Sequence, residues 1–280
     1  MPTFPTTHPV TVSVDVPFAT VHVFAGERDD VVVTVLPSDP SRSGSVRAAE
    51  EVRVDHDGDT VAITYPGSWK QWVLPFASGT ADITVELPTG SAVRGRAGSL
   101  TAEGVLGGVE MTLSAGDVRV EDVERLTLKV AAGSVVAGRI AGTGEIKVSA
   151  GSVRLGEVAG DAAVRAGAGP VSVGSVTGAL DVHGAHGDVT VGRVRGAVTA
   201  KTAHGGIRAD GVESGSVSVS TSFGSIEVGV AAGTAAYLDA GSEHGTVRNQ
   251  LVSTGGPEQG ERTAEVRART GFGDVVVRRS

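Results

Sequence analysis

Three histidines are the residues of this sequence that first suggest chemistry. His183 and His186 lie three positions apart, and His204 follows His186 after eighteen residues. Imidazole is a common metal ligand and a general base near neutral pH. The regular spacing leaves two interpretations open: a metal site shared by His186 and His204, or rings repeated at one position of a packed interior.

Two carboxylates offer a second chemistry. Glycosidases flank the bond that they cut with a pair of Asp or Glu side chains. Glu145 and Asp181 hold the same place in two repeats of the sequence, and stacked strands would separate them by about 9.6 Å. No long insertion near them could form a cleft, so we expect no catalytic residues and no enzyme. A polysaccharide-active β-helix hydrolase or lyase that uses this pair is the alternative.

Other signatures of catalysis or cofactor binding are missing from the sequence. The chain has no cysteine, which excludes disulfides, thiolate metal sites and cysteine nucleophiles. It contains no GxxxxGKS/T or HExxH motif, so we expect no cofactor and no metal. The net charge of −8, with only four lysines and no basic run, argues against nucleic acid as a partner.

The sequence repeats itself with a period of about eighteen residues. A glycine that follows a small or ring-bearing residue, and precedes a turn residue and then Val, Ile or Leu, recurs ten times. These anchor glycines are Gly98, Gly116, Gly133, Gly151, Gly169, Gly187, Gly205, Gly224, Gly245 and Gly273. Between them, apolar and polar residues alternate, and further glycines separate the alternating stretches. Alternation by two predicts strands with one buried face, and the glycines permit corners between them.

A single repeat is too short to bury its own apolar face, whereas stacked repeats bury it together. The sequence therefore predicts an all-β fold, a β-solenoid (β-helix) of about ten coils, each with three short strand segments. Residues 91–280 would form these coils. Residues 1–90 lack the period but alternate in longer runs, and we expect them to form a β-rich N-terminal cap continuous with the solenoid.

Positions within a repeat are counted back from its anchor glycine, so that the residue just before the glycine is at position −1. Counting by two places positions −7, −5, −3 and −1 on the buried face. Position −1 is Ala in the first five repeats and a ring in the last five, and the rings are His186, His204, Phe223, His244 and Phe272. Because His and Phe exchange there, we expect a structural stack of rings in the core, matched in volume by position −3.

Position −4 should face outward, and three of the four lysines fall there. The basic residues of this column are Lys129, Lys147, Arg165 and Lys201, with His183 among them. Stacked coils would align them into a ladder. Two interpretations remain open: a solvated face that protects the sheet, or a possible polyanion-binding ladder for a polymer such as an anionic wall polymer.

The two ends of the sequence carry further expectations. The last repeat, TGFGDVVVRRS, ends at Ser280 and should leave strand edges free, so we expect a monomer or a homodimer through this C-terminal coil. No signal peptide is visible in the first seventeen residues, and no apolar run is long enough for a membrane span. We expect a cytoplasmic location, with the cell surface reached by a non-classical route as the alternative.

The V-x-V-x-G-x-V-x-G pattern with its AGDV, AGSV and HGDV anchors resembles the bacterial putative-adhesin family of β-strand-repeat domains of unknown function, over about residues 19–277. The resemblance implies a β-solenoid domain with no established catalytic residues. It also implies a non-enzymatic binding or scaffold role, in adhesion or in the cell-envelope stress response. The partner would be a protein or a cell-envelope polymer that the sequence does not identify.

Overall fold

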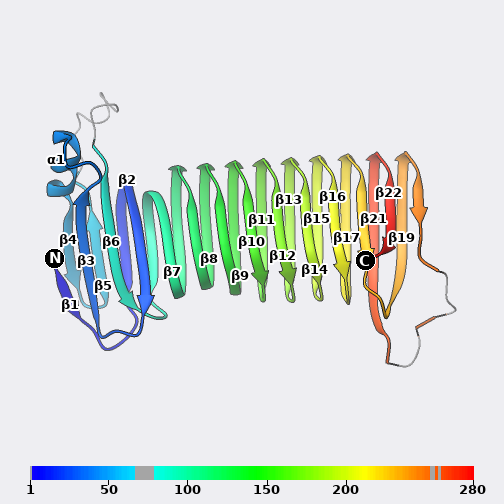
Figure 1. The fold of residues 1–280 in the computed structure, drawn as a ribbon, viewed down its shortest axis with the longest axis horizontal. Coiled ribbons are helices and arrows are strands. Elements are labelled where there is room, and N and C mark those ends of the chain that lie inside the picture. Colours follow the sequence, from blue (N-terminus) through cyan, green and yellow to red (C-terminus); the bar gives the residue numbers. More distant parts are fainter. Residues whose placement is uncertain (1, 67–78, 253–255, 258–259) are drawn as a thin grey trace. The chain divides into compact units, whose positions relative to one another are not determined.

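The computed structural model describes residues 2–66, 79–252, 256–257 and 260–280. Strands dominate this part of the chain, and the predicted all-β solenoid is confirmed (Figure 1). The chain divides into two compact units between Gly133 and Ser134, while the boundary near residue 90 remains a prediction from the sequence. Within the described ranges, no helix is long and apolar enough to cross a membrane.

The first unit contains eight strands and one helix among its described residues. They are β1 (Thr3–Pro5), β2 (Thr11–Gly26), β3 (Asp30–Pro37), α1 (Ser43–Glu51), β4 (Arg53–Asp57), β5 (Thr60–Thr64), β6 (Ala81–Pro88), β7 (Ala92–Ala115) and β8 (Val118–Ala132). β2 pairs in parallel with β5, β6 and β7, and β7 with β8. β3 pairs antiparallel with β1 and β6. The helix α1 follows a stretch without alternation and buries Ser45 and Ala48.

The second unit is built from coils. Its strands are β9 (Val135–Ala150), β10 (Val153–Val158), β11 (Asp161–Ala168), β12 (Val171–Val176), β13 (Ala179–His186), β14 (Val189–Val194), β15 (Ala197–His204), β16 (Ile207–Val212), β17 (Gly215–Phe223), β18 (Ile226–Val230), β19 (Thr234–His244), β20 (Val247–Asn249), β21 (Arg262–Phe272) and β22 (Val275–Arg279). From β10 to β18 each coil has a first strand and a second strand, each paired in parallel with its equivalents in neighbouring coils.

Each of these coils therefore holds two strands and not the three segments that we expected, whereas β9 continues as one strand beside both β10 and β11. The glycine in the first strand does not end it but lies close to the neighbouring coil, where a Cβ on Gly174 would be 2.5 Å from the carbonyl oxygen of Gly156. The coil of β10 and β11 buries six side chains: Val153, Leu155, Val158, Ala162, Val164 and Ala166. Burying a Val or Leu contributes about 1.5–3 kcal/mol. This narrow interior is filled by small aliphatic residues, which accounts for the 4% aromatic content.

The last coil of the sequence lies within the stack and not at its end. β21 pairs in parallel with β17 on one side and with β19 on the other. β22 lies in the same way between β18 and β20. Figure 1 shows the red strands of this inserted coil beside the orange β19. The chain thus places its final coil between two coils that precede it in sequence.

The predicted free edge of the C-terminal coil is therefore wrong, and this edge gives no basis for a homodimer; the choice between monomer and homodimer stays a prediction. Both strands of the inserted coil have partners on two sides. Among the described strands from β10 to β22, only β19 and β20 are paired on one side only. Every coil presents the same row of backbone donors and acceptors, so an eighteen-residue period does not specify which coil lies next to which.

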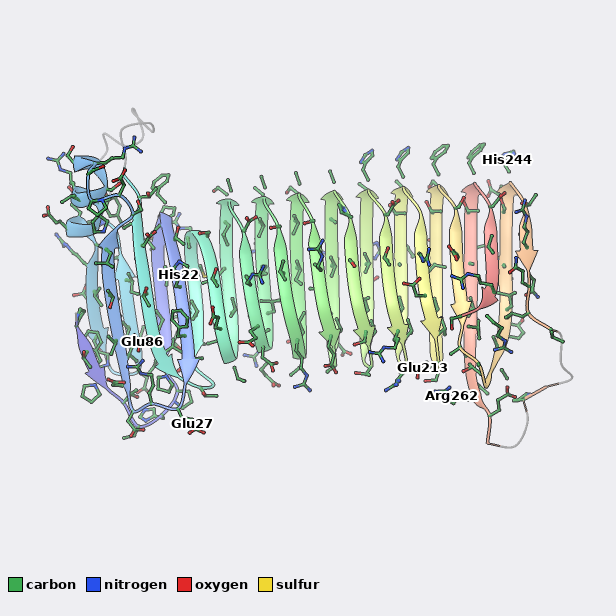
Figure 2. The ribbon with its side chains drawn as sticks, viewed as in Figure 1. His22, Glu27, Glu86, Glu213, His244 and Arg262 are labelled. Carbon is green, nitrogen blue, oxygen red and sulfur yellow. The ribbon has the colours of Figure 1, made fainter. Side chains whose placement is uncertain are left out.

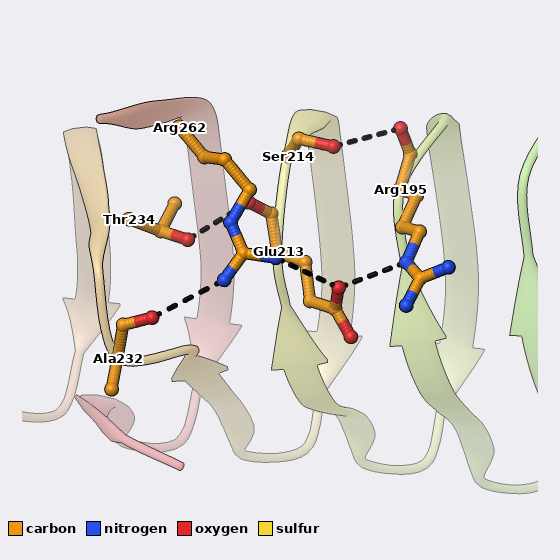
Figure 3. A network of polar contacts seen from close by, with 6 residues as sticks. All are labelled: Arg195, Glu213, Ser214, Ala232, Thr234 and Arg262. Carbon is orange, nitrogen blue, oxygen red and sulfur yellow. Dashed lines mark hydrogen bonds and ion pairs between the residues drawn. The ribbon is translucent and has the colours of Figure 1, made fainter. Parts of the chain in front are cut away.

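Arginines of the inserted coil bind the segment that crosses over it. Nη1 of Arg279 donates to the carbonyl oxygens of Ala231 and Thr234, both at 2.9 Å. Nη2 of Arg262 donates to the carbonyl oxygen of Ala232 at 3.3 Å (Figure 3). Buried or half-buried carbonyls need such donors where no strand supplies them. These contacts attach the segment between β18 and β19 to the inserted coil.

Glu213 joins the inserted coil to the coils before it. Its Oε2 accepts hydrogen bonds from Nε of Arg195 at 2.8 Å and from Nη1 of Arg262 at 3.1 Å. Its backbone carbonyl accepts a bond of 2.8 Å from the hydroxyl of Thr234. The bond from Arg195, together with the nearby positive charges, holds the pKa of Glu213 below its ordinary value.

The order of the coils can be tested with paired cysteines, because the chain has none of its own. Ser218 lies opposite Arg267 on the adjacent strand, and Arg267 lies opposite Asp239 on the next. Adjacent strands are about 4.8 Å apart, within the range of a disulfide, whereas a separation of two strands exceeds it. We expect Ser218→Cys with Arg267→Cys to oxidise to a disulfide, measured by loss of free thiols. Ser218→Cys with Asp239→Cys should stay reduced, and the reverse result would contradict the inserted order.

We also expect Glu213 to contribute to the loss of folding stability at low pH. Since its pKa is lowered in the folded state, its stabilising effect is present at neutral pH. The effect is lost as the pH falls below about 4, where the carboxylate takes up a proton. Thermal melting between pH 7 and pH 3 should show a smaller acid-induced fall of Tm for Glu213→Gln than for the wild type. Glu124→Gln, a change of an exposed carboxylate on β8, is the control and should behave as the wild type does.

Candidate functional site

The five rings at position −1 stack in one column of the second unit. From one end, the ring centroids of His186, His204, Phe223, Phe272 and His244 are separated by 4.9, 5.0, 5.0 and 4.5 Å. The order differs from the sequence order because of the inserted coil. The rings are not in the core: Phe223 and Phe272 are each 48% exposed, and the labelled His244 projects away from the coils in Figure 2. The predicted core position is therefore wrong.

The alternation between inside and outside breaks before the anchor glycine, which is why the parity count failed. In β11, Ala166 is buried, but both Gly167 and Ala168 are exposed. The strand register skips position −2 and resumes with Ala168 opposite His186. The corner follows at once, with a φ of 123° at Gly169, a value that favours glycine. Position −1 therefore points off the corner into solvent.

Position −3 has a separate role in the coils that carry rings. Thr221 and Thr270 are buried, and their hydroxyls donate to the carbonyl oxygens of the anchor glycines Gly205 and Gly224 at 3.0 and 2.8 Å. Ser242 donates in the same way to the neighbouring coil. A buried hydroxyl needs such a partner. In these three coils the residue at −3 is explained by this bond between coils, not by volume matching with the ring.

The stacked histidines are poorly arranged for a shared metal ion. The rings of His186 and His204 lie 4.9 Å apart with only 3° between their planes. Their nitrogen lone pairs lie in the ring planes, so parallel rings direct them side by side and not to one point. A zinc ion held at about 2.0–2.1 Å from each nitrogen requires the two lone pairs to converge. Within the described residues, no group of three His, Cys, Asp or Glu side chains could hold a metal either.

The basic residues at position −4 are aligned by the strand register of the second unit. Along adjacent strands the column runs through Lys147, Arg165, His183, Lys201, Ser220, Arg269 and Gly241. Three of the four predicted ladder residues thus share one column. The fourth, Lys129, lies on β8 of the first unit, opposite Thr112.

We call this row of position −4 residues the basic column. Carboxylates at position −6 lie beside some of its members. Nζ of Lys147 lies 2.6 Å from Oε1 of Glu145. Nε2 of His183 lies 3.1 Å from Oδ1 of Asp181, though without the geometry of a hydrogen bond. The two carboxylates proposed for an enzyme each face a basic side chain of their own strand. Between them in the register stands Ala163.

Two cations of the basic column have no carboxylate within ion-pair distance among the described residues: Arg165 and Lys201. Position −6 of their strands is Ala163 and Thr199, neither of which carries a charge. Both cationic side chains are exposed. Arg269, further along the column, is held by Asp239 at 2.6 Å.

A long shallow groove runs beside the basic column. One part is lined by Lys147, Arg165, His183 and the small residues that follow them in each strand. The adjoining part shares His183 and Gly184 and continues past Lys201, Ser220 and Arg269 to the rings of Phe223 and Phe272. In this second part the groove lies between the basic column and the rings of Phe223 and Phe272. Neither Glu145 nor Asp181 lines either part.

Sequence reasoning missed the groove and the place of Arg269 in it. Arg269 joins the column only because the last coil is inserted beside β17. The sequence does contain a weak signal for this order: the segments TSFGSI and TGFGDV share Thr at −3 and Phe at −1, whereas the intervening SEHGTV has neither. Similar coils stack on one another, and the dissimilar one lies at the end.

A sequence profile described as Toastrack DUF4097 matches residues 11–278, which confirms the family resemblance. The chain has no match among curated protein sequences.

Several solved structures align over nearly the whole chain. A putative adhesin from Bacteroides fragilis is 11% identical over 99% of this chain and 95% of that one, with a TM-score of 0.30. A putative cell adhesion protein from Clostridium sporogenes is 11% identical over 97% and 93%, with a TM-score of 0.27. A putative adhesin from Parabacteroides distasonis is 10% identical over 100% and 95%, with a TM-score of 0.27. Similarity at this level carries no argument about the groove.

The exposure of the rings leads to a clear expectation for stability. His204→Asp should lower the free energy of unfolding by no more than about 1.5 kcal/mol, the size of a lost ring contact. Val191→Asp places a carboxylate at a position that is 1% exposed, and it should unfold the protein or cost several times more. Urea denaturation followed by circular dichroism measures both. Equal and severe losses would show that position −1 is buried after all.

Proposed function

The chain belongs to the Toastrack DUF4097 family. We propose that it is a non-enzymatic, adhesin-like binding module, and that it binds a linear anionic polymer in the groove of the second unit. The observation that carries the proposal is the alignment of exposed cations along this groove, with Arg165 and Lys201 free of carboxylate partners among the described residues. The polymer would be a component of a cell envelope.

The form of the groove favours a polymer over a small molecule. Small-molecule sites are enclosed and mostly apolar, whereas this groove is open and extends across successive coils with the same side chains repeated. A single exposed ion pair contributes only about 0–1 kcal/mol. Useful affinity therefore requires several contacts made by one ligand, which a linear polymer supplies through multivalency.

The positions of the carboxylates support binding without turnover. A glycosidase needs one carboxyl to donate a proton and another to act as base or nucleophile on the same bond. Glu145 and Asp181 instead each face a basic side chain of their own strand. They also lie outside the groove that a polymer would occupy.

The proposal predicts binding that depends on charge and on the groove. Polygalacturonate, hyaluronan and poly(glycerol phosphate) are suitable polyanions, with dextran as the neutral polymer, and biolayer interferometry at low and high salt measures their binding. Binding of at least one polyanion should fall about tenfold or more in the Arg165→Glu/Lys201→Glu variant, and it should weaken with salt.

The control variant carries the same change of net charge elsewhere. Arg154→Glu/Arg193→Glu alters two exposed arginines on the first strands of their coils, and it should retain most of the binding. Assays for new reducing ends in the same samples test turnover. Cleavage that Asp181→Asn abolishes would overturn the non-enzymatic proposal, as would the absence of any polyanion binding.

A further inference from the structure

Charge along the basic column alternates from coil to coil. The cation of one strand is partnered by the carboxylate two residues before it, as Lys147 is by Glu145. The next strand has Ala163 at that place and leaves Arg165 free among the described residues. The following strand pairs His183 with Asp181.

The alternation continues in the next coil, where Thr199 stands at position −6 and leaves Lys201 free. Arg165 and Lys201 are therefore separated by one coil, in which Asp181 lies beside His183. Parallel strands lie about 4.8 Å apart, so this separation is about 9.6 Å. Arg269 stands two strands beyond Lys201 in the same register, with Ser220 between them, but it is held by Asp239 at 2.6 Å.

A ligand that binds both Arg165 and Lys201 needs one negative charge for every two coils. An extended pyranose chain advances by about one strand spacing per sugar. The sugars that lie beside Arg165 and Lys201 are therefore every second sugar of such a chain. A polymer with a charge on every sugar would place half of its charges at Lys147 and His183, next to the carboxylates of Glu145 and Asp181 that border the groove and are each about half exposed. Carboxylate beside carboxylate is unfavourable even at a solvated surface.

The ring column sets a second requirement. Rings stacked at 4.5–5.0 Å cover one another's faces, so that the groove meets mainly ring edges. Sugars that pack flat on an aromatic face find no such face within the column. Ring edges are electropositive and suit oxygen atoms. The rings thus favour a polar ligand that lies along them.

From these observations we infer that the groove is selective for linear acidic polysaccharides in which a uronic acid alternates with a neutral sugar. This inference rests on the proposed binding function and specifies its ligand. Selectivity comes from the alternation of charge at position −6, and not from the total number of cations.

Two probes of equal length test the inference on the full chain. Hyaluronan oligosaccharides carry a carboxylate on every second sugar, and oligogalacturonates of the same number of sugars carry one on each. Isothermal titration calorimetry should show hyaluronan binding about threefold tighter or more, the size of one exposed ion-pair contribution, although it carries half the charge. Equal or tighter binding of oligogalacturonate would overturn the inference.

A variant at position −6 tests the origin of the selectivity. Ala163→Asp places a carboxylate beside Arg165 as Glu145 lies beside Lys147, and it should weaken hyaluronan binding about threefold or more. Ala163→Asn has nearly the same size without the charge and should bind as the wild type does. Glu145→Gln/Asp181→Asn removes the carboxylates and should bring the two probes to equal affinity.

The outcomes separate this inference from the proposed function. If both probes bind equally to the wild type and the Arg165→Glu/Lys201→Glu variant loses both, the binding function stands and the alternation is wrong. If neither probe nor any other polyanion binds, the proposed function itself fails. Matching thermal melts for Ala163→Asp and Ala163→Asn exclude a difference in folding.

Discussion

The close approach of backbone at the glycine corners is the constraint on which the second unit depends. At Gly169 a Cβ would lie 1.9 Å from the carbonyl oxygen of Gly151, and φ is 123°. Both facts require glycine, and both hold because one corner rests directly on the next. This contact fixes each coil against its neighbour, and parallel hydrogen bonding then carries the same register through both strands.

A fixed register turns each position of the repeat into a column with its own chemistry. Position −3 supplies hydroxyls that bond the anchor carbonyl of the adjacent coil, as Thr270 does. Position −1 supplies rings that contact one another outside the core. Positions −4 and −6 supply cations and carboxylates, whose pairing within a strand leaves some cations free. The groove arises between these columns and needs no insertion in the chain.

The inserted coil shows that the stack is held by contacts specific to certain coils as well as by the repeated ones. Arg279 and Arg262 bind carbonyls of the crossing segment, and Glu213 receives Arg262 beside Arg195. The same insertion brings Arg269 into the basic column and Phe272 beside Phe223. One change of coil order thus contributes both to the stability of this end and to the composition of its groove.

The sequence by itself determined the period, the glycine corners and the outward column that contains Lys147, Arg165 and Lys201, because these follow from local alternation and from the spacing of equivalent residues. Tertiary structure decided three other features. The order of the last coils is not encoded in a period, since every coil offers the same pairing edge, and only side chains such as Arg279 distinguish them. The rings lie outside because the corner breaks the alternation after position −3. The partner of Arg269, finally, is Asp239 on the adjacent strand, which only the inserted coil brings within reach, whereas Lys147 and Glu145 lie two residues apart on one strand.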